Sequence, residues 1–256
     1  MYTVYHIYVP IARKNKTLLF PKKFGIIVLL IEGGKTNMAK YLLFDLDGTL
    51  TDPGVGITNA VRYALEKFGV HPASREELYP YIGPPLIESF QRYQGMTPDR
   101  AKQALADYRE YFSATGIFEN ELYPGIADVL SRLRGAGYTL IVATSKPEEF
   151  THRILEHFGL SQYFDFVGGN TLDESRPTKE SVIAYIREQY PEMREDTAWM
   201  IGDRRYDVEG AHACGLPAIG VTYGYGSREE LIQAGAEALA TDPEDLYRVI
   251  VGGILH

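Results

Sequence analysis

Cysteine is almost absent from the sequence, since Cys214 is the single one among 256 residues. A lone cysteine excludes an internal disulfide framework and any metal cluster built on cysteine thiolates. Long apolar runs are also missing: the longest, residues 24–31, has eight residues, whereas a helix needs about twenty to cross a bilayer. We therefore expect no membrane partner and a cytoplasmic location.

Positive charge is scarce over most of the chain. The formal net charge is −8 and the isoelectric point about 5.3, and residues 41–256 alone carry −14 because residues 1–40 carry +6. An acidic surface repels a phosphate backbone, so we expect no nucleic-acid polymer as a partner. The remaining composition, 45% hydrophobic and 23% charged, is that of an ordinary globular protein with one or two domains.

The basic segment 1–37 has three interpretations. A targeting peptide would begin with basic residues, but here they come late and the apolar run ends in Glu32-Gly-Gly. An additional strand or helix docked on the body is a second possibility. We favour an N-terminal extension outside the fold, because Met38 opens the phrase Met-Ala-Lys-Tyr-Leu-Leu-Phe-Asp, which is typical of the start of a domain.

Short apolar runs alternate with helical patterns from residue 41 onward. Near-continuous apolar strands separated by helices predict an α/β fold with a Rossmann-like parallel sheet covered on both faces. Its strand ends, and any ligand site, should then share one edge. The predicted strands are residues 41–45, 138–144, 164–168, 197–202 and 217–221, with a weaker sixth at 236–240.

About ninety residues between the first two strands break this alternation. Ile57, Val61 and Leu65 are helix-spaced, as are residues 101, 105, 108 and 112, and no strand pattern interrupts them. We interpret residues 53–122 as an all-helical cap inserted into a catalytic core of residues 38–52 and 123–256. An insert that leaves from the carboxyl end of the first strand should lie over the active edge as a lid.

Two aspartates follow the first strand, in the phrase Phe44-Asp45-Leu46-Asp47-Gly48-Thr-Leu. Carboxylates at positions i and i+2 point the same way if extended backbone persists. They repel each other unless one is protonated or a cation joins them, and Mg²⁺ favours carboxylates together with substrate phosphate. The pair therefore indicates a metal site in which one carboxylate is free to attack.

This phrase resembles the first signature of the haloacid dehalogenase superfamily, in its phosphatase branch. The resemblance covers residues 40 to about 250, and the helical insert is similar to the cap of the phosphoglycolate-phosphatase and 5′-nucleotidase group. It implies that Asp45 is the nucleophile and forms an aspartyl-phosphate. Asp47 would protonate the leaving group and then deprotonate the hydrolytic water. The second aspartate, which the true dehalogenases lack, favours phosphoryl transfer.

Three further phrases match the family's signatures in order. Thr144 and Ser145 end the second strand, and Pro147 should be the first residue of the helix that follows. At this helix start, the hydroxyl of Thr144 and the amide of Ser145 would bind phosphate. The family also places a lysine at a helix start, where it neutralises phosphate and nucleophile. We choose Lys179, with Arg176 as a weaker alternative for the same role.

The last phrase, Gly202-Asp203-Arg-Arg-Tyr-Asp207, follows the fourth strand. The resemblance implies that Asp203 is a direct metal ligand, and that Asp207 is a second ligand or orients Lys179. Asp45 and the backbone carbonyl of Asp47 would complete the set around Mg²⁺.

The resemblance thus implies an Mg²⁺-dependent phosphomonoester hydrolase that acts on a small phosphorylated metabolite. Phosphoglycolate and a nucleoside 5′-monophosphate are equal candidates, and a monomer and a homodimer are both open. A phosphosugar mutase is an alternative on the same fold. A non-catalytic binding or regulatory protein is the alternative of another class, although the nucleophile and the motif lysine that such a protein would lack are both present.

Overall fold

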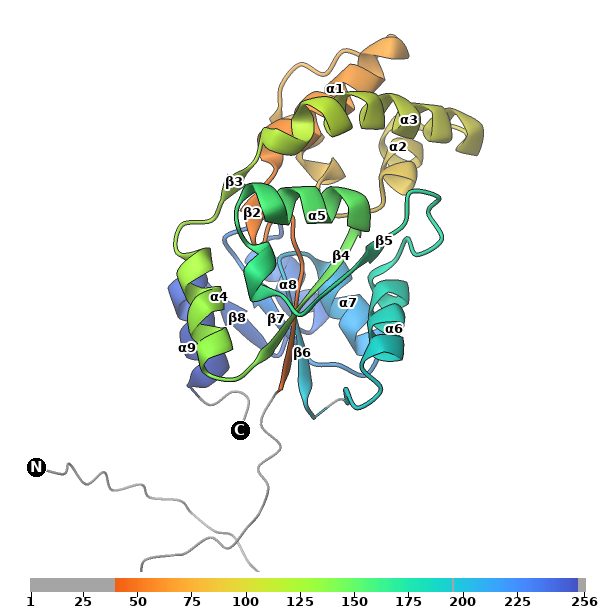
Figure 1. Cartoon of the computed structure of the whole chain (residues 1–256). Coiled ribbons are helices and arrows are strands. Elements are labelled where there is room, and N and C mark those ends of the chain that lie inside the picture. The colour runs from red at the N-terminus through yellow and green to blue at the C-terminus, as the bar shows by residue number, and fades with distance from the viewer. Residues whose placement is uncertain (1–39, 195, 253–256) are drawn as a thin grey trace, which may run out of the picture. The chain divides into compact units, whose positions relative to one another are not determined.

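The computed structural model describes residues 40–194 and 196–252 (Figure 1). It contains a parallel six-stranded sheet in the order β5-β4-β1-β6-β7-β8, so the predicted parallel α/β fold is confirmed. The strands are β1 (Tyr41–Phe44), β4 (Thr139–Pro147), β5 (Phe166–Asn170), β6 (Ala198–Gly202), β7 (Ala218–Val221) and β8 (Ala238–Ala240). The prediction for residues 1–37 lies outside the described residues.

Strand β1 lies in the middle of the sheet and is buried on both faces. Leu42 and Phe44 belong to one hydrophobic cluster, while Tyr41 and Leu43 belong to the other. This alternation follows from the two-residue period of a strand, and it explains why β1 reads as a continuous apolar run in the sequence. Its neighbours are β4, with Leu43 opposite Ile141, and β6 on the other side.

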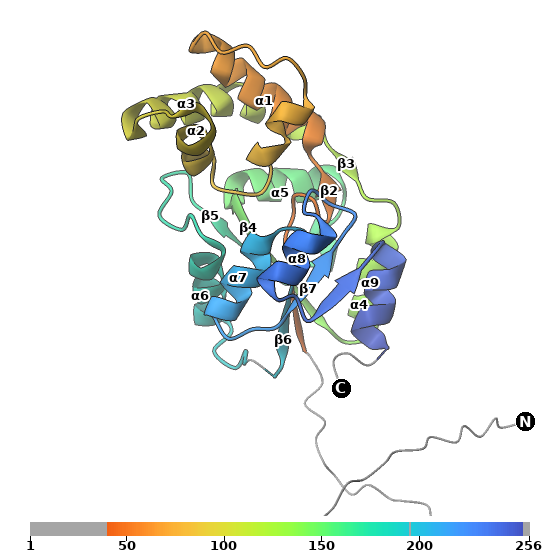
Figure 2. The ribbon, with the colours of Figure 1, turned by 180° about the vertical axis from the view of Figure 1, so that it is seen from behind.

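Helices cover both faces of the sheet (Figures 1 and 2). The cluster that contains Leu42 packs under α4 (Ile126–Gly135), α5 (Glu148–His157) and α9 (Pro243–Val251). The opposite cluster packs under α6 (Lys179–Gln189), α7 (Arg205–Ala213) and α8 (Arg228–Ala234). None of the helices in the part of the chain that the structure describes is long and apolar enough to cross a membrane.

The strand order reverses direction at β1. After β1 the chain goes to β4 and β5 on one side, and it then returns to the other side for β6, β7 and β8. The loops at the carboxyl ends of β1, β4 and β6 are therefore neighbours around a topological switch point. This is where α/β sheets form their ligand-binding crevice.

The helices inserted after β1 leave and return through a short antiparallel pair. Strand β2 (Thr51–Asp52) pairs with β3 (Glu121–Leu122), so the two connections run side by side. Between them lie α1 (Gly54–Lys67), η1 (Glu76–Tyr81), α2 (Leu86–Gln94), α3 (Pro98–Ala114) and η2 (Gly116–Phe118). We call this segment the helical insert. Strand β3 is a strand that the sequence pattern did not predict within residues 53–122.

Helices α1 and α3 carry the two helical stripes seen in the sequence. Ile57, Val61 and Leu65 of α1 are buried, as are Leu105 and Tyr108 of α3. The insert's buried side chains continue into the cluster on the α4–α5 face of the sheet. It is therefore packed on the core through apolar side chains as well as tied to it through its two connections.

Candidate active site

Asp45 follows β1 directly and is buried at the carboxyl edge of the sheet. Its backbone N–H donates to the carbonyl of Ile201, which extends the β1–β6 pairing by one residue. The chain then turns sharply at Gly48, whose φ is +82°. A Cβ at Gly48 would lie 2.2 Å from Oδ2 of Asp203, so only glycine permits this close approach. The turn thereby brings the loop after β1 against the end of β6.

Lys179 is the first residue of α6, and Thr178 caps this helix by accepting from the backbone N–H of Ser181. The cap fixes where the helix begins, and the lysine side chain reaches back under the sheet edge. Its Nζ donates to Oδ1 of Asp45 (2.8 Å) and to the carbonyl of Ala143 (2.7 Å), and it lies 2.7 Å from Oδ1 of Asp207. Three N–H groups thus meet three oxygens.

The electrostatics of Lys179 follow from these contacts. Burial by itself lowers the pKa of this lysine, but the carboxylates of Asp207 and Asp45 outweigh burial and raise it. Lys179 is therefore a fixed positive charge beside Asp45. The competing prediction of Arg176 is not supported by position, because Arg176 pairs with Glu148 at 2.9 Å instead.

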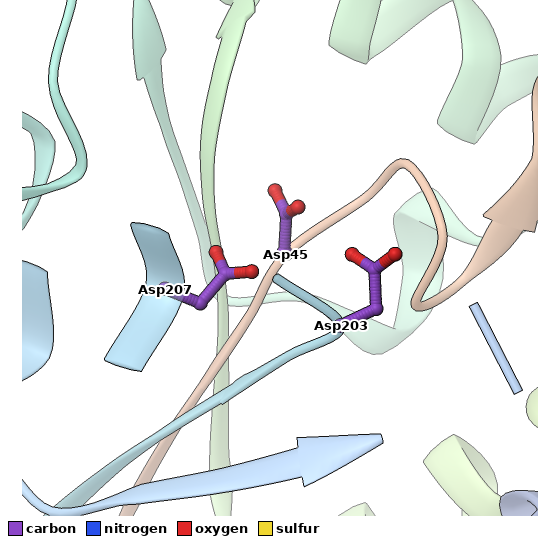
Figure 3. Close-up of side chains that lie close together, drawn as sticks. All are labelled: Asp45, Asp203 and Asp207. Atoms are coloured by element: carbon purple, nitrogen blue, oxygen red, sulfur yellow. The ribbon is translucent and has the colours of Figure 1, made fainter. Parts of the chain in front are cut away.

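Three buried carboxylates gather at this edge, as Figure 3 shows. Asp203 follows β6, Asp207 lies in the first turn of α7, and each offers an oxygen within 4.8 Å of an oxygen of Asp45. Burial, with repulsion from Asp207 and Asp45, raises the pKa of Asp203 well above its usual value. Burial also raises the pKa of Asp207 to about 6, although Lys179 lowers it. Ionised together, these carboxylates lack a sufficient counter-charge.

A divalent cation with a preference for oxygen fits this donor set. Four aspartates and two lysines at the sheet edge leave a formal charge of −2 when all are ionised. Oδ1 of Asp203 is buried without a hydrogen-bond partner among the described residues, while Oδ2 accepts from the backbone N–H of Tyr225 at 2.7 Å. Buried carboxylate oxygens without protein partners are ligands that Mg²⁺ accepts.

The end of β4 supplies the opposite wall. Thr144 is buried, and Thr144 and Ser145 line the same cavity as Asp45 and Asp47. The strand continues to Pro147, and α5 begins at Glu148, so the expectation that Pro147 is the first helical residue is wrong by one position. Pro147 has φ −54° and ψ 134°, an extended backbone in which it caps the helix instead of starting it.

Asp47 is not among the three gathered carboxylates, and its side chain has a different partner. Its Oδ2 lies 3.0 Å from Nζ of Lys146, a buried lysine on β4 that the motif analysis missed. Burial raises the pKa of Asp47, whereas Lys146 lowers it. The side chain of Asp47 is therefore not one of the gathered metal donors, and only its backbone carbonyl remains for the predicted ligation.

The loop after β7 is a second contribution that the motifs did not reveal. Tyr225 supplies the N–H to Asp203, and the hydroxyl of Tyr223 donates to the carbonyl of Thr49 at 3.1 Å. Between them, a Cβ at Gly224 would lie 2.3 Å from the carbonyl oxygen of Gly48. The phrase Tyr-Gly-Tyr-Gly after an apolar strand was the available signal for this close approach.

The helical insert closes the cavity from the other side. Ile57, Tyr81, Leu105, Tyr108 and Phe112 line it together with the residues of β1 and β4. The structure thus brings Asp45, Asp47, Thr144 and Ser145 to one cavity. Lys179, Asp203 and Asp207 pack around Asp45, so all seven predicted site residues lie at the same sheet edge.

A parallel sheet with charged side chains at its switch point is typical of α/β enzymes, which bind their ligands at this edge. The family model of haloacid dehalogenase-like hydrolases matches residues 42–221, and the chain belongs to that family. The crystal structure of a predicted phosphatase from Clostridium acetobutylicum superimposes with a TM-score of 0.82 at 47% identity, covering 84% of this chain and 99% of that one.

Relatives with assigned names also match over most of their length. A 5′-nucleotidase from Pseudomonas aeruginosa is 43% identical over 190 residues, which are 74% of this chain and 86% of that protein. Tyrosine-protein kinase PtkA from Mycobacterium tuberculosis is 40% identical, with 78% and 67% covered. A phosphoglycolate phosphatase from Vibrio parahaemolyticus is 27% identical, with 82% and 96% covered. Within its family, this chain is a phosphatase.

Proposed function

We propose that the chain is an Mg²⁺-dependent phosphomonoesterase that hydrolyses small phosphorylated metabolites through an aspartyl-phosphate on Asp45. The contact between Nζ of Lys179 and Oδ1 of Asp45, 2.8 Å long and buried, carries this proposal. It holds a carboxylate at the floor of a cavity with a fixed cation beside it. A nucleophile that attacks a dianionic phosphate ester needs such a cation.

The residues around Asp45 support a two-step reaction. In the first step, a carboxylate oxygen of Asp45 bonds to phosphorus, the bond from phosphorus to the ester oxygen breaks, and Asp47 gives its proton to that oxygen. In the second step, Asp47 takes a proton from a water molecule, which attacks phosphorus and releases Asp45. The hydroxyl of Thr144, the amide of Ser145 and Lys179 would hold the phosphoryl oxygens.

The metal role is assigned to the carboxylates that gather at the sheet edge. Asp45, Asp203 and Asp207, with the backbone carbonyl of Asp47, would hold Mg²⁺. Bound there, the ion would offset negative charge on the phosphoryl group in the transition state. Asp207 also contacts Lys179, so it has a second role in orienting that lysine.

The residues that line the cavity support different roles for two domains. We propose residues 38–52 and 123–256 as the catalytic core and residues 53–122 as a cap that excludes bulk water and selects the leaving group. The cap-side wall is apolar and aromatic, with Tyr81, Tyr108 and Phe112 among its members. Such a wall suits the alcohol part of a small ester better than a protein surface.

Two classes of substrate are equally supported within this proposal. The relatives named 5′-nucleotidase and phosphoglycolate phosphatase support a nucleoside 5′-monophosphate and phosphoglycolate respectively. A cytoplasmic location and a monomeric or homodimeric state stay predictions.

The test is a panel of small phosphate esters, assayed by release of inorganic phosphate with Mg²⁺ and with a chelator. We expect hydrolysis that requires the metal and disappears in Asp45→Asn. The matched control is Asp128→Asn, an exposed aspartate on α4, which should retain full activity. Activity that survives in Asp45→Asn would refute the assignment. Transfer of the phosphoryl group to a second hydroxyl, without free phosphate, would point to a mutase instead.

A further inference from the structure

Lys146 is a buried lysine that the reaction outlined above does not use. It lies on β4, two residues after Thr144, and its side chain is 6% exposed. Its Nζ is 3.0 Å from Oδ2 of Asp47. The other carboxylate oxygen of Asp47, Oδ1, is buried and has no hydrogen-bond partner among the described residues. One oxygen of this carboxylate is therefore held, and the other has no protein partner in the part of the chain that the structure describes.

The helical insert covers the head of this lysine. Nζ of Lys146 lies 4.3 Å from the ring centroid of Phe112 on α3, within the range of a cation–π contact. Phe112 is itself fixed, because it stacks on Tyr108 at 5.2 Å and meets the edge of Phe150 at 5.6 Å. The lysine head is thus enclosed between a carboxylate of the core and an aromatic face of the insert.

We propose that Lys146 is a positioning residue for Asp47: it holds Oδ2 so that Oδ1 faces the leaving-group oxygen, and Phe112 of the insert keeps it there. This inference rests on the proposed function, since it assumes that Asp47 is the proton donor. Through this contact the insert would affect the reaction. If Phe112 were displaced, Lys146 could move and would no longer hold Asp47 in one orientation.

The geometry favours this role over direct binding of substrate by Lys146. A lysine that binds a second anionic group of the substrate would present a free ammonium to the cavity. Here Nζ already has a carboxylate at 3.0 Å and an aromatic ring at 4.3 Å. Binding of such a group is therefore an alternative outcome of the experiment.

The leaving group provides the means to test the proposal. In the first step, the ester oxygen takes the proton of Asp47 as its bond to phosphorus breaks. An alkyl oxygen is a poor leaving group and needs this proton, whereas p-nitrophenolate leaves without it. The ratio kcat/KM reports only the steps up to formation of the aspartyl-phosphate. A defect in orienting Asp47 should therefore appear in kcat/KM for alkyl esters and be small for the aryl ester.

The experiment compares Lys146→Met with the native enzyme on ethyl phosphate, phosphoglycolate and p-nitrophenyl phosphate. Methionine keeps the apolar stem against Phe112 and removes the charge. We expect kcat/KM to fall by about ten- to a hundredfold for the two alkyl esters, with their KM little changed, and by less than about threefold for the aryl ester. The matched control is Lys67→Met, which removes a lysine paired with Asp107 away from the cavity and should alter none of these values.

Three results would overturn the proposal. Equal losses for all three esters would show a general structural effect. A rise in KM for phosphoglycolate alone would show that Lys146 binds the substrate's carboxylate. A native enzyme inactive on every ester would remove the proposed function itself, and the inference with it. If a thermal melt shows that Lys146→Met does not fold, Phe112→Leu replaces it in the same experiment. Its kcat/KM should again fall more for the alkyl esters than for the aryl ester, by smaller factors.

Discussion

The two buried lysines of the active site have different surroundings. Lys179 contacts three oxygens, those of Asp45, Asp207 and the carbonyl of Ala143, and all three belong to the sheet edge and its helices. Lys146 instead lies between Asp47 of the core and Phe112 of the helical insert. In the proposed reaction, the part of the site that would face phosphorus is therefore complete within the core, whereas the part that would face the leaving group needs the insert.

This difference separates two kinds of defect. If Asp45 is the nucleophile, a change around Lys179 should alter the nucleophile and the charge at phosphorus, which every phosphate ester shares. A change around Lys146 alters how the leaving oxygen is protonated, which depends on the ester. If the two regions act separately, each variant should show one of these two patterns of loss.

Lys179→Met should produce the largest loss. We expect kcat/KM to fall by about a hundred- to a thousandfold for aryl and alkyl esters alike, because the fixed cation at phosphorus is lost. The free energy of unfolding should fall by about 3–5 kcal/mol, since removal of one partner leaves buried carboxylates unpaired. Steady-state kinetics on two esters and urea unfolding check these values. A loss of kcat/KM that depends on the leaving group would show that the regions around Lys179 and Lys146 do not act separately.

Added Mg²⁺ should stabilise the phosphorus-facing region. At a hundred times the dissociation constant, bound metal raises the free energy of unfolding by about 2.7 kcal/mol. Thermal melts with and without the metal measure the shift, and Asp203→Asn should greatly reduce it because a buried donor is replaced. Asp128→Asn, the exposed control, should keep the full shift. A shift that persists in Asp203→Asn would place the metal elsewhere.

Without divalent metal, stability should depend on pH through the same carboxylates. The native pKa of Asp207 is raised from 3.8 to about 6, so the folded protein holds a proton that the unfolded chain has already released. Stability therefore falls as the pH rises through this window, by up to about 1.4 kcal/mol per pH unit. Urea unfolding in the presence of a chelator, at several pH values, gives the free energy of unfolding of the native protein and of Asp207→Asn. The difference between the two isolates this contribution. A difference between the two that stays flat or has the opposite slope would contradict it.

The smallest effect is expected at a contact between insert and core that lies outside both lysine clusters. Arg109 of α3 donates to the carbonyl of Leu172 at 2.8 Å and pairs with Glu174 after β5. Both partners are about a quarter exposed, so this contact contributes about 0–1 kcal/mol. Arg109→Gln should raise KM by less than about threefold and leave kcat unchanged, and Glu174→Gln should match it. Added salt should reduce the difference from the native enzyme. A large fall in kcat in either variant would show that this contact shapes the chemistry.

Sequence patterns located the residues around Lys179, but they did not reveal the surroundings of Lys146. Asp45, Asp203 and Lys179 lie within a residue of a strand end or helix start, and the order of a parallel sheet brings such positions together. Lys146 is in the same phrase as Thr144, but it contacts Phe112, which is 34 positions earlier and on helix α3. No spacing along one strand encodes that contact.

Local geometry accounts for the remaining differences in the fold. The pair β2–β3 has two residues in each strand, too few to leave a pattern of alternation. The start of α5 was misplaced by one residue because proline is common both at the first helical position and just before it. The N–H of Tyr225 that binds Asp203 is a backbone contact, which side-chain motifs do not reveal.

The most direct test of the account is to find the phosphoryl group on the enzyme. Asp47→Asn, mixed with p-nitrophenyl phosphate and Mg²⁺, should form the intermediate and hydrolyse it slowly, because the aryl group leaves without a proton and no base activates water. Acid quenching followed by peptide mass mapping should then find one phosphoryl group, on Asp45. A phosphoryl group on another residue, or turnover by an enzyme that is never phosphorylated, would contradict the proposal that Asp45 is the nucleophile.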